Sequence, residues 1–293
     1  MAAGQRGLGT GTVLALLAMG IAVFVVANDF TALSVALPSI ETQFGTDVST
    51  VQWVINGYAL VFGVLIVTGG RFADLFGRRR IFFLGAGIFA VFSVLGGFAP
   101  GIGWLLAARA VMAVGGAMMW PAILGMTYTI LPPARAGLAG ALILGAAGFG
   151  NAAGPLIGGL LTDTLGWRWV FFLNLPIAAG AVLVTWLTVH ISQTPAPGAS
   201  RRIDVPGVVA LSAGLLTLLI ALDVGTDVGW GNPQILALLG FSALSLVLLA
   251  VIERRAGTGA LVPADVMGKR DFLAASLTVL MMSAIFFAAL VYL

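Results

Sequence analysis

The sequence consists largely of long apolar runs separated by short polar segments. A transmembrane helix needs about 20 mainly apolar residues to cross roughly 30 Å of hydrocarbon. Because backbone groups inside a bilayer must be hydrogen-bonded within their own segment, we expect each run to be a helix. The nine runs of suitable length are Thr12–Leu37, Val51–Thr68, Ile81–Phe98, Gly103–Leu124, Gly137–Leu161, Trp167–Val189, Gly207–Leu222, Ile235–Ile252 and Phe272–Leu293. The predicted fold is all-α, a polytopic bundle of membrane helices.

Composition places the chain among integral membrane proteins. Of its 293 residues, 60% are hydrophobic and only 9% are charged, whereas soluble domains carry about 25% charged residues. The chain has no cysteine and one histidine, which excludes disulfides and cysteine catalysis and argues against a metal site built from these residues. We therefore expect no metal and no cofactor. The sequence also contains no nucleophile elbow and no histidine dyad, so we expect no enzyme activity.

Basic residues predict how the chain is oriented in the bilayer. Cytoplasmic loops of membrane proteins carry an excess of Lys and Arg. A cytoplasmic N-terminus places twelve of the 14 basic residues on the inner side, so we expect a multi-pass protein of the plasma membrane in this orientation. The net charge of +3 is explained by these loops, and we expect no nucleic-acid partner. The twelve residues are Arg6, Arg71, Arg78, Arg79, Arg80, Arg135, Arg201, Arg202, Arg254, Arg255, Lys269 and Arg270.

Two charged residues lie inside predicted spans. Asp29 is about 12 Å and Arg109 about 9 Å from the outer end of its span, at 1.5 Å per residue. A carboxylate inside a span costs on the order of 3 kcal/mol, so it should face a cavity or a partner. At similar depth the two charges could pair or share a water-filled cavity, and Asp29 is a candidate proton-binding group. Alternatively, Asn28 and Asp29 mark a helix end, and Arg109 extends its head group to the nearby surface.

Glycines form one face of the span at residues 137–161. Gly150, Gly154 and Gly158 recur at four-residue spacing, which favours close contact with another helix. Pro155 has no backbone N–H, which frees the carbonyl of Asn151 and should bend the helix. This face is a packing interface in either case, and the bend is also a candidate element for switching between conformations.

Two polar segments are expected at the membrane surfaces. The basic segment Gly69–Arg80 predicts a tight cytoplasmic loop, in which Asp74 can accept hydrogen bonds from nearby arginines. Alternatively, Arg78–Arg80 only anchor the topology. The segment Trp167–Pro176 is expected to be an interfacial anchor that enters the next span.

Two segments resemble motifs of the major facilitator superfamily in its helices 2 to 4. Leu105–Ala117, which contains Arg109, resembles the helix-4 motif that is tied to proton coupling. The basic segment resembles the signature loop between helices 2 and 3, and the matching residues are Gly70, Asp74, Gly77, Arg78 and Arg80.

Two further segments resemble motifs of proton-coupled antiporters. Asp29–Pro38 is similar to the helix-1 motif of the fourteen-helix drug:proton antiporters, with Ser34 where Asn is usual. The glycine face resembles the helix-5 motif of antiporters, and the matching residues are Gly150, Gly154, Pro155, Gly158 and Gly159.

This resemblance implies a division of the chain into four parts. Residues 1–190 correspond to an N-terminal six-helix half and residues 191–206 to a cytoplasmic linker. Residues 207–252 correspond to two linker transmembrane helices, and residues 253–293 to a cytoplasmic loop and the first helix of a C-terminal half. The chain is therefore expected to lack the rest of that half, and a reading frame that continues past Leu293 would support this.

The resemblance also implies a function. We expect a proton-coupled efflux transporter of amphiphilic small molecules or drugs that works by alternating access, with Asp29 and Arg109 in proton coupling. Its expected partners are a small-molecule substrate, protons, the lipid bilayer and a missing C-terminal half. The alternatives are a half-transporter that is inactive alone or needs a partner half, and a nutrient symporter, which the helix-5 resemblance disfavours.

Overall fold

The computed structural model describes residues 9–189, 204–256, 269–270, 272–279 and 281–282. These residues form helices joined by turns, and none of them lies in a β-strand. The all-α fold expected from the apolar runs is confirmed. The chain divides into two compact units, Met1–Ala196 and Pro197–Leu293, which are described separately below.

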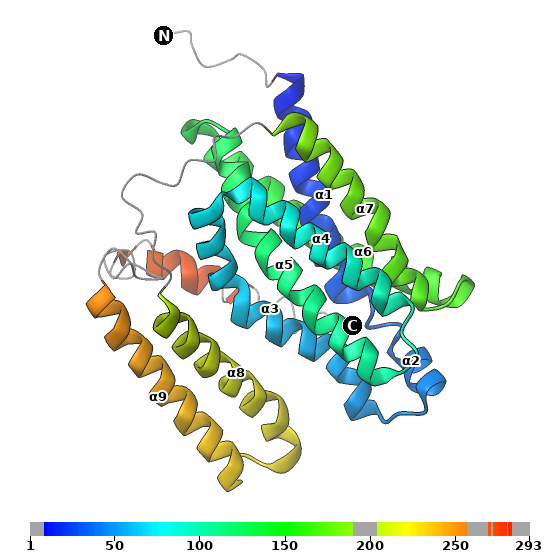
Figure 1. The fold of residues 1–293 in the computed structure, drawn as a ribbon, viewed down its shortest axis with the longest axis vertical. Coiled ribbons are helices and arrows are strands. Elements are labelled where there is room, and N and C mark those ends of the chain that lie inside the picture. The colour runs from blue at the N-terminus through cyan, green and yellow to red at the C-terminus, as the bar shows by residue number, and fades with distance from the viewer. Residues whose placement is uncertain (1–8, 190–203, 257–268, 271, 280, 283–293) are drawn as a thin grey trace. The chain divides into compact units, whose positions relative to one another are not determined.

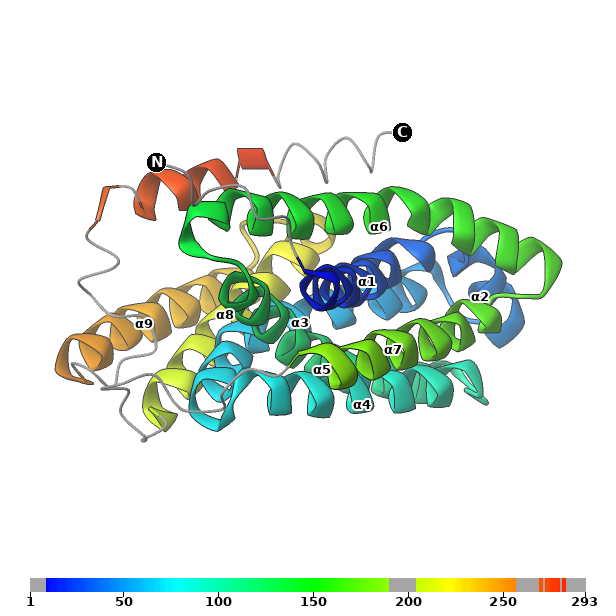
Figure 2. The same ribbon diagram turned by 90° about the horizontal axis from the view of Figure 1, so that it is seen from above.

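The first unit is a bundle of long helices (Figure 1). Helix α1 packs against α5, α6 and α7, and Figure 2 shows it between α6 and α7. Helix α5 packs against α3 and α4, and α4 also packs against α7. The elements are α1 (Thr10–Ala32), α2 (Leu37–Phe44), α3 (Val48–Phe76), α4 (Arg78–Gly97), α5 (Ile102–Ile130), the 3-10 turn η1 (Pro133–Arg135), α6 (Ala136–Thr164) and α7 (Arg168–Thr188).

The second unit contains a pair of helices, α8 (Val205–Val228) and α9 (Pro233–Ala256), which lie side by side (Figure 1). The chain turns between them at Gly229, whose φ of 89° is readily adopted only by glycine. The hydroxyl of Ser242 on α9 donates to the carbonyl of Gly214 on α8 over 2.8 Å, which fixes their contact.

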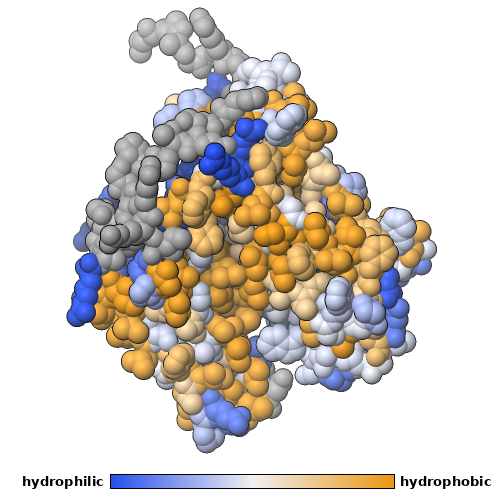
Figure 3. Space-filling model, in the orientation of Figure 1, coloured by the Kyte–Doolittle hydropathy of each residue, from blue (hydrophilic) through white to orange (hydrophobic). Residues whose placement is uncertain are grey.

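Eight helices of the described residues are long and apolar enough to cross a membrane. They correspond to the first eight predicted spans, whereas the ninth, Phe272–Leu293, falls mostly outside the described residues. Figure 3 shows apolar side chains over much of the visible surface of the helices, with polar side chains gathered near helix ends. The protein is therefore a multi-pass membrane protein.

The first span is shorter than predicted. Helix α1 ends at Ala32 rather than at Leu37, and its last turn is closed by Ser34, whose hydroxyl donates to Thr31 O over 2.7 Å. Pro38 directly follows the last residue of the predicted span, where proline would be expected to end the helix, but it is not the residue at which α1 ends. It lies in the first turn of α2, where the missing N–H of proline has no helical partner to lose.

The predicted loop at Gly69–Arg80 is largely helical, so its predicted extent is wrong. Helix α3 has 29 residues, or about 43 Å at 1.5 Å per residue, which exceeds a hydrocarbon thickness of roughly 30 Å. Its last turns, with Arg71 and Asp74, can therefore extend beyond the bilayer as a helix. Only Gly77 interrupts the helical path, with a φ of 97° that allows the turn into α4.

Glycines allow α5 to lie very close to its neighbours. A Cβ at Gly115 of α5 would stand 2.6 Å from the carbonyl oxygen of Gly85 on α4. A Cβ at Gly69 of α3 would collide with the carbonyl oxygen of Ala117 on α5. These contacts hold α5 between α3 and α4 and position Arg109, which lies six residues before Gly115 on the same helix.

Candidate functional site

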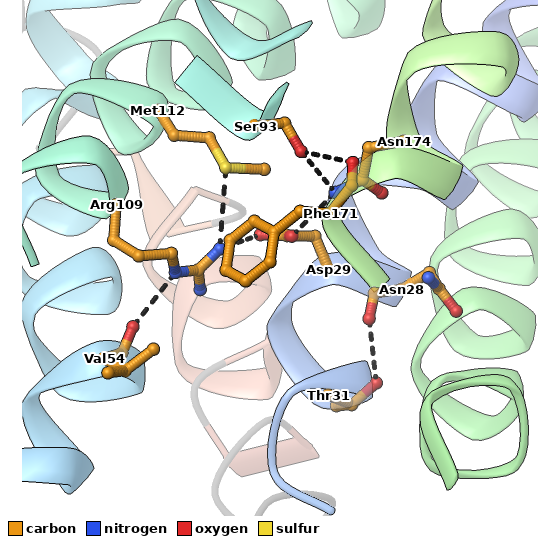
Figure 4. A network of polar contacts seen from close by, with 9 residues as sticks. All are labelled: Asn28, Asp29, Thr31, Val54, Ser93, Arg109, Met112, Phe171 and Asn174. Atoms are coloured by element: carbon orange, nitrogen blue, oxygen red, sulfur yellow. Dashed lines mark hydrogen bonds and ion pairs between the residues drawn. The ribbon is translucent and has the colours of Figure 1, made fainter. Parts of the chain in front are cut away.

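Asp29 and Arg109 form an ion pair inside the first unit. Asp29 lies on α1 and Arg109 on α5, and Arg109 Nη1 donates to Asp29 Oδ2 over 2.5 Å (Figure 4). Their side chains are 0% and 1% exposed. Arg109 therefore does not extend to the surface, and Asp29 lies within α1, three residues before the helix ends. Of the two arrangements expected for these charges, the structure shows direct pairing.

Arg109 joins three helices of the bundle. Besides Asp29 of α1, its Nε donates to the carbonyl of Val54 on α3 over 3.0 Å. Its guanidinium carbon lies 4.0 Å from the ring centroid of Tyr58, also on α3, in a cation–π contact. A further contact runs from Nη1 to Met112 Sδ at 3.7 Å. The positive charge of α5 is thus held by a carboxylate, a carbonyl and an aromatic face, which together replace water around it.

The second oxygen of Asp29 is bound by Asn174, which was not among the site residues predicted from the sequence. Asn174 of α7 donates from Nδ2 to Asp29 Oδ1 over 3.0 Å and to Ser93 Oγ over 3.1 Å. Ser93 of α4 donates in turn to the carbonyl of Phe171 over 2.7 Å. Asn174 and Ser93 are both fully buried. The pair and these two residues form one polar network that connects α1, α4, α5 and α7 (Figure 4).

The expectation that residues 167–176 form an interfacial anchor is wrong for Asn174. Trp169 is 48% exposed, whereas Trp167 and Asn174 are buried. Trp167 donates from Nε1 to Gln43 Oε1 of α2 over 2.7 Å. The signal that could have identified Asn174 is an amide in an apolar span, since such a group needs a partner inside the bundle.

Several polar atoms in and next to this network have no partner within the described residues. They are the side-chain amide of Asn28, Tyr58 Oη, Arg109 Nη2 and Asn174 Oδ1, and all are buried. Buried polar groups usually bind a protein group or an ordered water. The described residues contain no group of three or more His, Cys, Asp or Glu that could hold a metal ion. The chemistry that the network offers is thus hydrogen bonding and proton binding at one carboxylate.

The glycine face of α6 packs directly on α1, beside the ion pair. A Cβ at Gly150 would stand 2.8 Å from the carbonyl oxygen of Phe24, and a Cβ at Gly154 or Gly158 would collide with the backbone or side chain of Thr31 and Ala32. Gly159 is less constrained, because its nearest neighbour would be a methyl group of Val35 at 3.6 Å. These glycines therefore bring α6 against the part of α1 that contains Asp29.

Pro155 frees a carbonyl of α6, which accepts a hydrogen bond from α1. Because Pro155 lies inside α6 and has no N–H, the carbonyl of Asn151 has no helical partner at that position. In the structure, the hydroxyl of Thr31 on α1 donates to Asn151 O over 3.0 Å. This hydrogen bond links the two helices at the point where Pro155 interrupts the ladder of α6.

The residues around Gly77 lie far from the ion pair. Arg78 Nη1 donates to Gly125 O over 2.8 Å and to Thr129 Oγ1 over 3.0 Å, and Nη2 lies 3.4 Å from Asp74 Oδ1. Gly125 follows Arg109 by 16 residues on α5, or about 24 Å of helix. Arg79 donates to Trp186 O of α7 over 2.9 Å, whereas Arg80 is exposed.

The same segment packs closely against α5 at one of its glycines. A Cβ at Gly70 would stand 3.4 Å from the ring of Pro121. The signature residues therefore fasten the junction of α3 and α4 to α5, at a separate place from Asp29.

Comparison with known proteins identifies the family. The profile of the Major Facilitator Superfamily matches residues 19–293. The chain belongs to the major facilitator superfamily. The residues that resemble its helix-1, helix-4 and helix-5 motifs meet at the part of α1 that contains Asp29, and those that resemble its signature loop lie at the junction of α3 and α4.

Several relatives in this superfamily have names that refer to antibiotic resistance or export. The puromycin resistance protein of Streptomyces alboniger is 40% identical over 231 residues, which are 78% of this chain and 45% of that protein. The tetracenomycin C resistance and export protein of Streptomyces glaucescens is 34% identical over 241 residues, 82% of this chain and 44% of that protein. A multidrug resistance protein of Mycobacterium tuberculosis is 33% identical over 243 residues, which are 83% of this chain and 45% of that protein. The chain spans about half the length of these superfamily members.

Proposed function

We propose that this chain is part of a proton-coupled efflux transporter of amphiphilic small molecules. The observation that carries the proposal is the buried ion pair of Asp29 and Arg109, at the junction of three superfamily motifs. A carboxylate within a membrane span marks a functional site by default, because its burial needs compensation. In this proposal Asp29 binds the transported proton and Arg109 responds to the loss of the negative charge.

The geometry supports a specific effect of protonation. A proton on Asp29 neutralises the carboxylate and leaves Arg109 without its counter-charge in a buried site. Breaking one partner of a buried pair typically costs about 3–5 kcal/mol. Protonation would therefore weaken the contact of α5 with α1, and the bundle would favour a second arrangement in which Arg109 finds another partner. Proton and substrate must favour different arrangements for exchange to be coupled.

The other motifs have supporting roles in this proposal. The glycine face of α6 and the hydrogen bond from Thr31 to Asn151 hold α6 on α1, and Pro155 supplies the bend about which this pair changes shape. The contacts of Arg78 with the end of α5 close the inner side of the bundle. In transporters of this kind the substrate binds near the bilayer midplane between two halves, and this chain contributes one of them.

The substrate class is proposed from the relatives. Their names refer to puromycin, tetracenomycin C and multidrug resistance. We infer that the cargo is likewise an amphiphilic organic molecule that is exported from the cytoplasm, with the N-terminus of the chain on the cytoplasmic side of the plasma membrane.

The test is transport by the complete polypeptide that carries this chain. Puromycin or a fluorescent amphiphilic cation would be added outside inside-out membrane vesicles under an imposed proton gradient, acidic inside, and its uptake would be measured. Uptake that collapses when a protonophore is added supports the proposal. Uptake that continues at the same rate after the protonophore is added would contradict proton coupling. Substrate that moves in the same direction as the proton would indicate a symporter, and no transport of either probe would contradict efflux.

A further inference from the structure

We propose that Asn174 is a positioning residue whose side-chain amide serves both protonation states of Asp29. The proposal rests on the proposed function, in which Asp29 takes up a proton. Asn174 is fully buried, lies on α7 and, like Arg109, donates a hydrogen bond to Asp29. It is thus placed to respond when the carboxylate changes its charge.

The surrounding groups fix the orientation of the amide in this structure. Ser93 has one hydroxyl hydrogen and donates it to Phe171 O over 2.7 Å, so toward Asn174 it can only accept. An ionised Asp29 can also only accept. Both therefore require the NH₂ group, and Asn174 Nδ2 faces Asp29 at 3.0 Å and Ser93 at 3.1 Å. The network as drawn in Figure 4 is the hydrogen-bond pattern of an ionised Asp29.

The oxygen of the same amide is an acceptor that a protonated Asp29 could use. Asn174 Oδ1 is buried and has no hydrogen-bond partner among the residues that the structure describes. When Asp29 Oδ1 takes a proton from the aqueous phase it becomes an O–H donor, and the present orientation would set it against the N–H donor of Asn174. A half-turn of the amide group exchanges Nδ2 with Oδ1. Oδ1 then accepts from Asp29 with one lone pair, and its second lone pair is available to the hydroxyl of Ser93 if that group turns away from Phe171.

Few other groups compete for this role. The charged or titratable groups that face Asp29 among the described residues are Arg109 of α5 and Tyr58 of α3, which stacks on the guanidinium. Asp163 of α6 and Arg168 of α7 lie at the ends of their helices. Arg109 can only donate. Asn174 is therefore the contacting residue that can both donate to the carboxylate and accept from the acid.

Infrared difference spectra of the purified protein in lipid, acidic minus neutral, test this directly. We expect a carboxylic C=O band that Asp29→Asn removes, together with a side-chain amide band that is identified by its shift on labelling with [13C]asparagine. Asn174→Leu should abolish the amide band and shift the carboxylic band. Thr185→Val is the matched control, because Thr185 is also a buried polar residue of α7 but lies outside the network, and it should keep both bands.

The outcomes separate this inference from the function on which it rests. If the wild-type spectrum has no carboxylic band that Asp29→Asn removes, proton uptake by Asp29 would be contradicted. The proposed role of Asn174 would then be contradicted as well. If the Asp29-dependent carboxylic band appears without an amide band, or if the amide band survives in Asn174→Leu, the role of Asn174 alone would be overturned.

Transport by the complete polypeptide gives a second readout. Asn174→Leu should lower proton-driven export about tenfold, the effect of losing one hydrogen bond to a charged group, while probe affinity stays within about twofold because no cargo contact is changed. Asn174→Ala, which removes the amide without adding apolar volume, serves if the leucine variant folds poorly. A parallel loss of affinity and transport in both variants, or transport equal to that of Thr185→Val, would overturn the proposal.

Discussion

Removal of the Arg109 guanidinium should destabilise the protein by much more than loss of a typical arginine. Arg109→Met keeps a long apolar stem but removes the ion pair with Asp29, the hydrogen bond to Val54 O and the cation–π contact with Tyr58. Because Asp29 is 0% exposed, its charge would be left buried, with the amide of Asn174 as its one remaining partner in the described part of the chain. Removing one partner of a buried ion pair costs about 3–5 kcal/mol, and we expect a loss of free energy of unfolding in this range.

A double-mutant cycle measures how much of that loss belongs to the pair. Asp29→Asn in the Arg109→Met background removes the uncompensated charge, so the double variant should be less destabilised than the sum of the single changes by about 2 kcal/mol or more. Reversible unfolding in mixed detergent micelles gives the free energies. Arg168→Met is the control: this half-buried arginine donates to Gln43 and Ala99 O, and its loss should cost about 1 kcal/mol. Additive single effects, within about 0.5 kcal/mol, would refute the inference that the charges are coupled.

Three further predictions follow from local geometry. Gly158→Val should separate α6 from α1 and lower both the melting temperature and transport, whereas Gly148→Val, at an open position of the same helix, should have little effect. Gly77→Ala should cost about 1–3 kcal/mol of unfolding free energy, because its φ of 97° strains any other residue, and Gly137→Ala is the control in open space. The pKa of Asp47 is held below its usual 3.8 by hydrogen bonds from the backbone N–H and the hydroxyl of Thr50, so Asp47→Ala should lower the melting temperature at neutral pH. That difference is present above 3.8 and should disappear as the pH falls through the lowered pKa of the folded state.

The fold could be predicted from the sequence because length and apolarity decide which segments cross a membrane. The predicted ends of two helices were wrong, since α3 continues beyond its apolar run and α1 stops before the end of its own. Arg71 and Asp74 suggested a loop, yet α3 includes both, because a helix that leaves the bilayer can remain helical in water. The first apolar run continues to Leu37, next to Pro38, yet α1 ends at Ala32, and Pro38 lies in the first turn of α2, a position that suits proline.

The candidate site could be predicted only in part. Asp29 and Arg109 were recognisable because a charge inside an apolar span is rare and needs a partner. Asn174 was not, because an uncharged amide close to two tryptophans and a proline resembles an interfacial segment. Whether it faces lipid or the bundle depends on the rotation of α7 against α1 and α4, which arises from packing between helices distant in sequence. The same holds for Ser93, whose partners lie 78 and 81 residues further along the chain.

The most direct test of the account is proton movement driven by the substrate. Vesicles that contain the complete polypeptide and an internal pH dye would receive a gradient of puromycin or of a fluorescent amphiphilic cation, with no proton gradient imposed. We predict that substrate efflux drives protons in the opposite direction in the wild type and in Asp163→Asn, whose carboxyl group is at the exposed end of α6. Asp29→Asn should abolish this proton flux. Proton flux of wild-type size in Asp29→Asn would contradict the claim that the buried ion pair binds the transported proton.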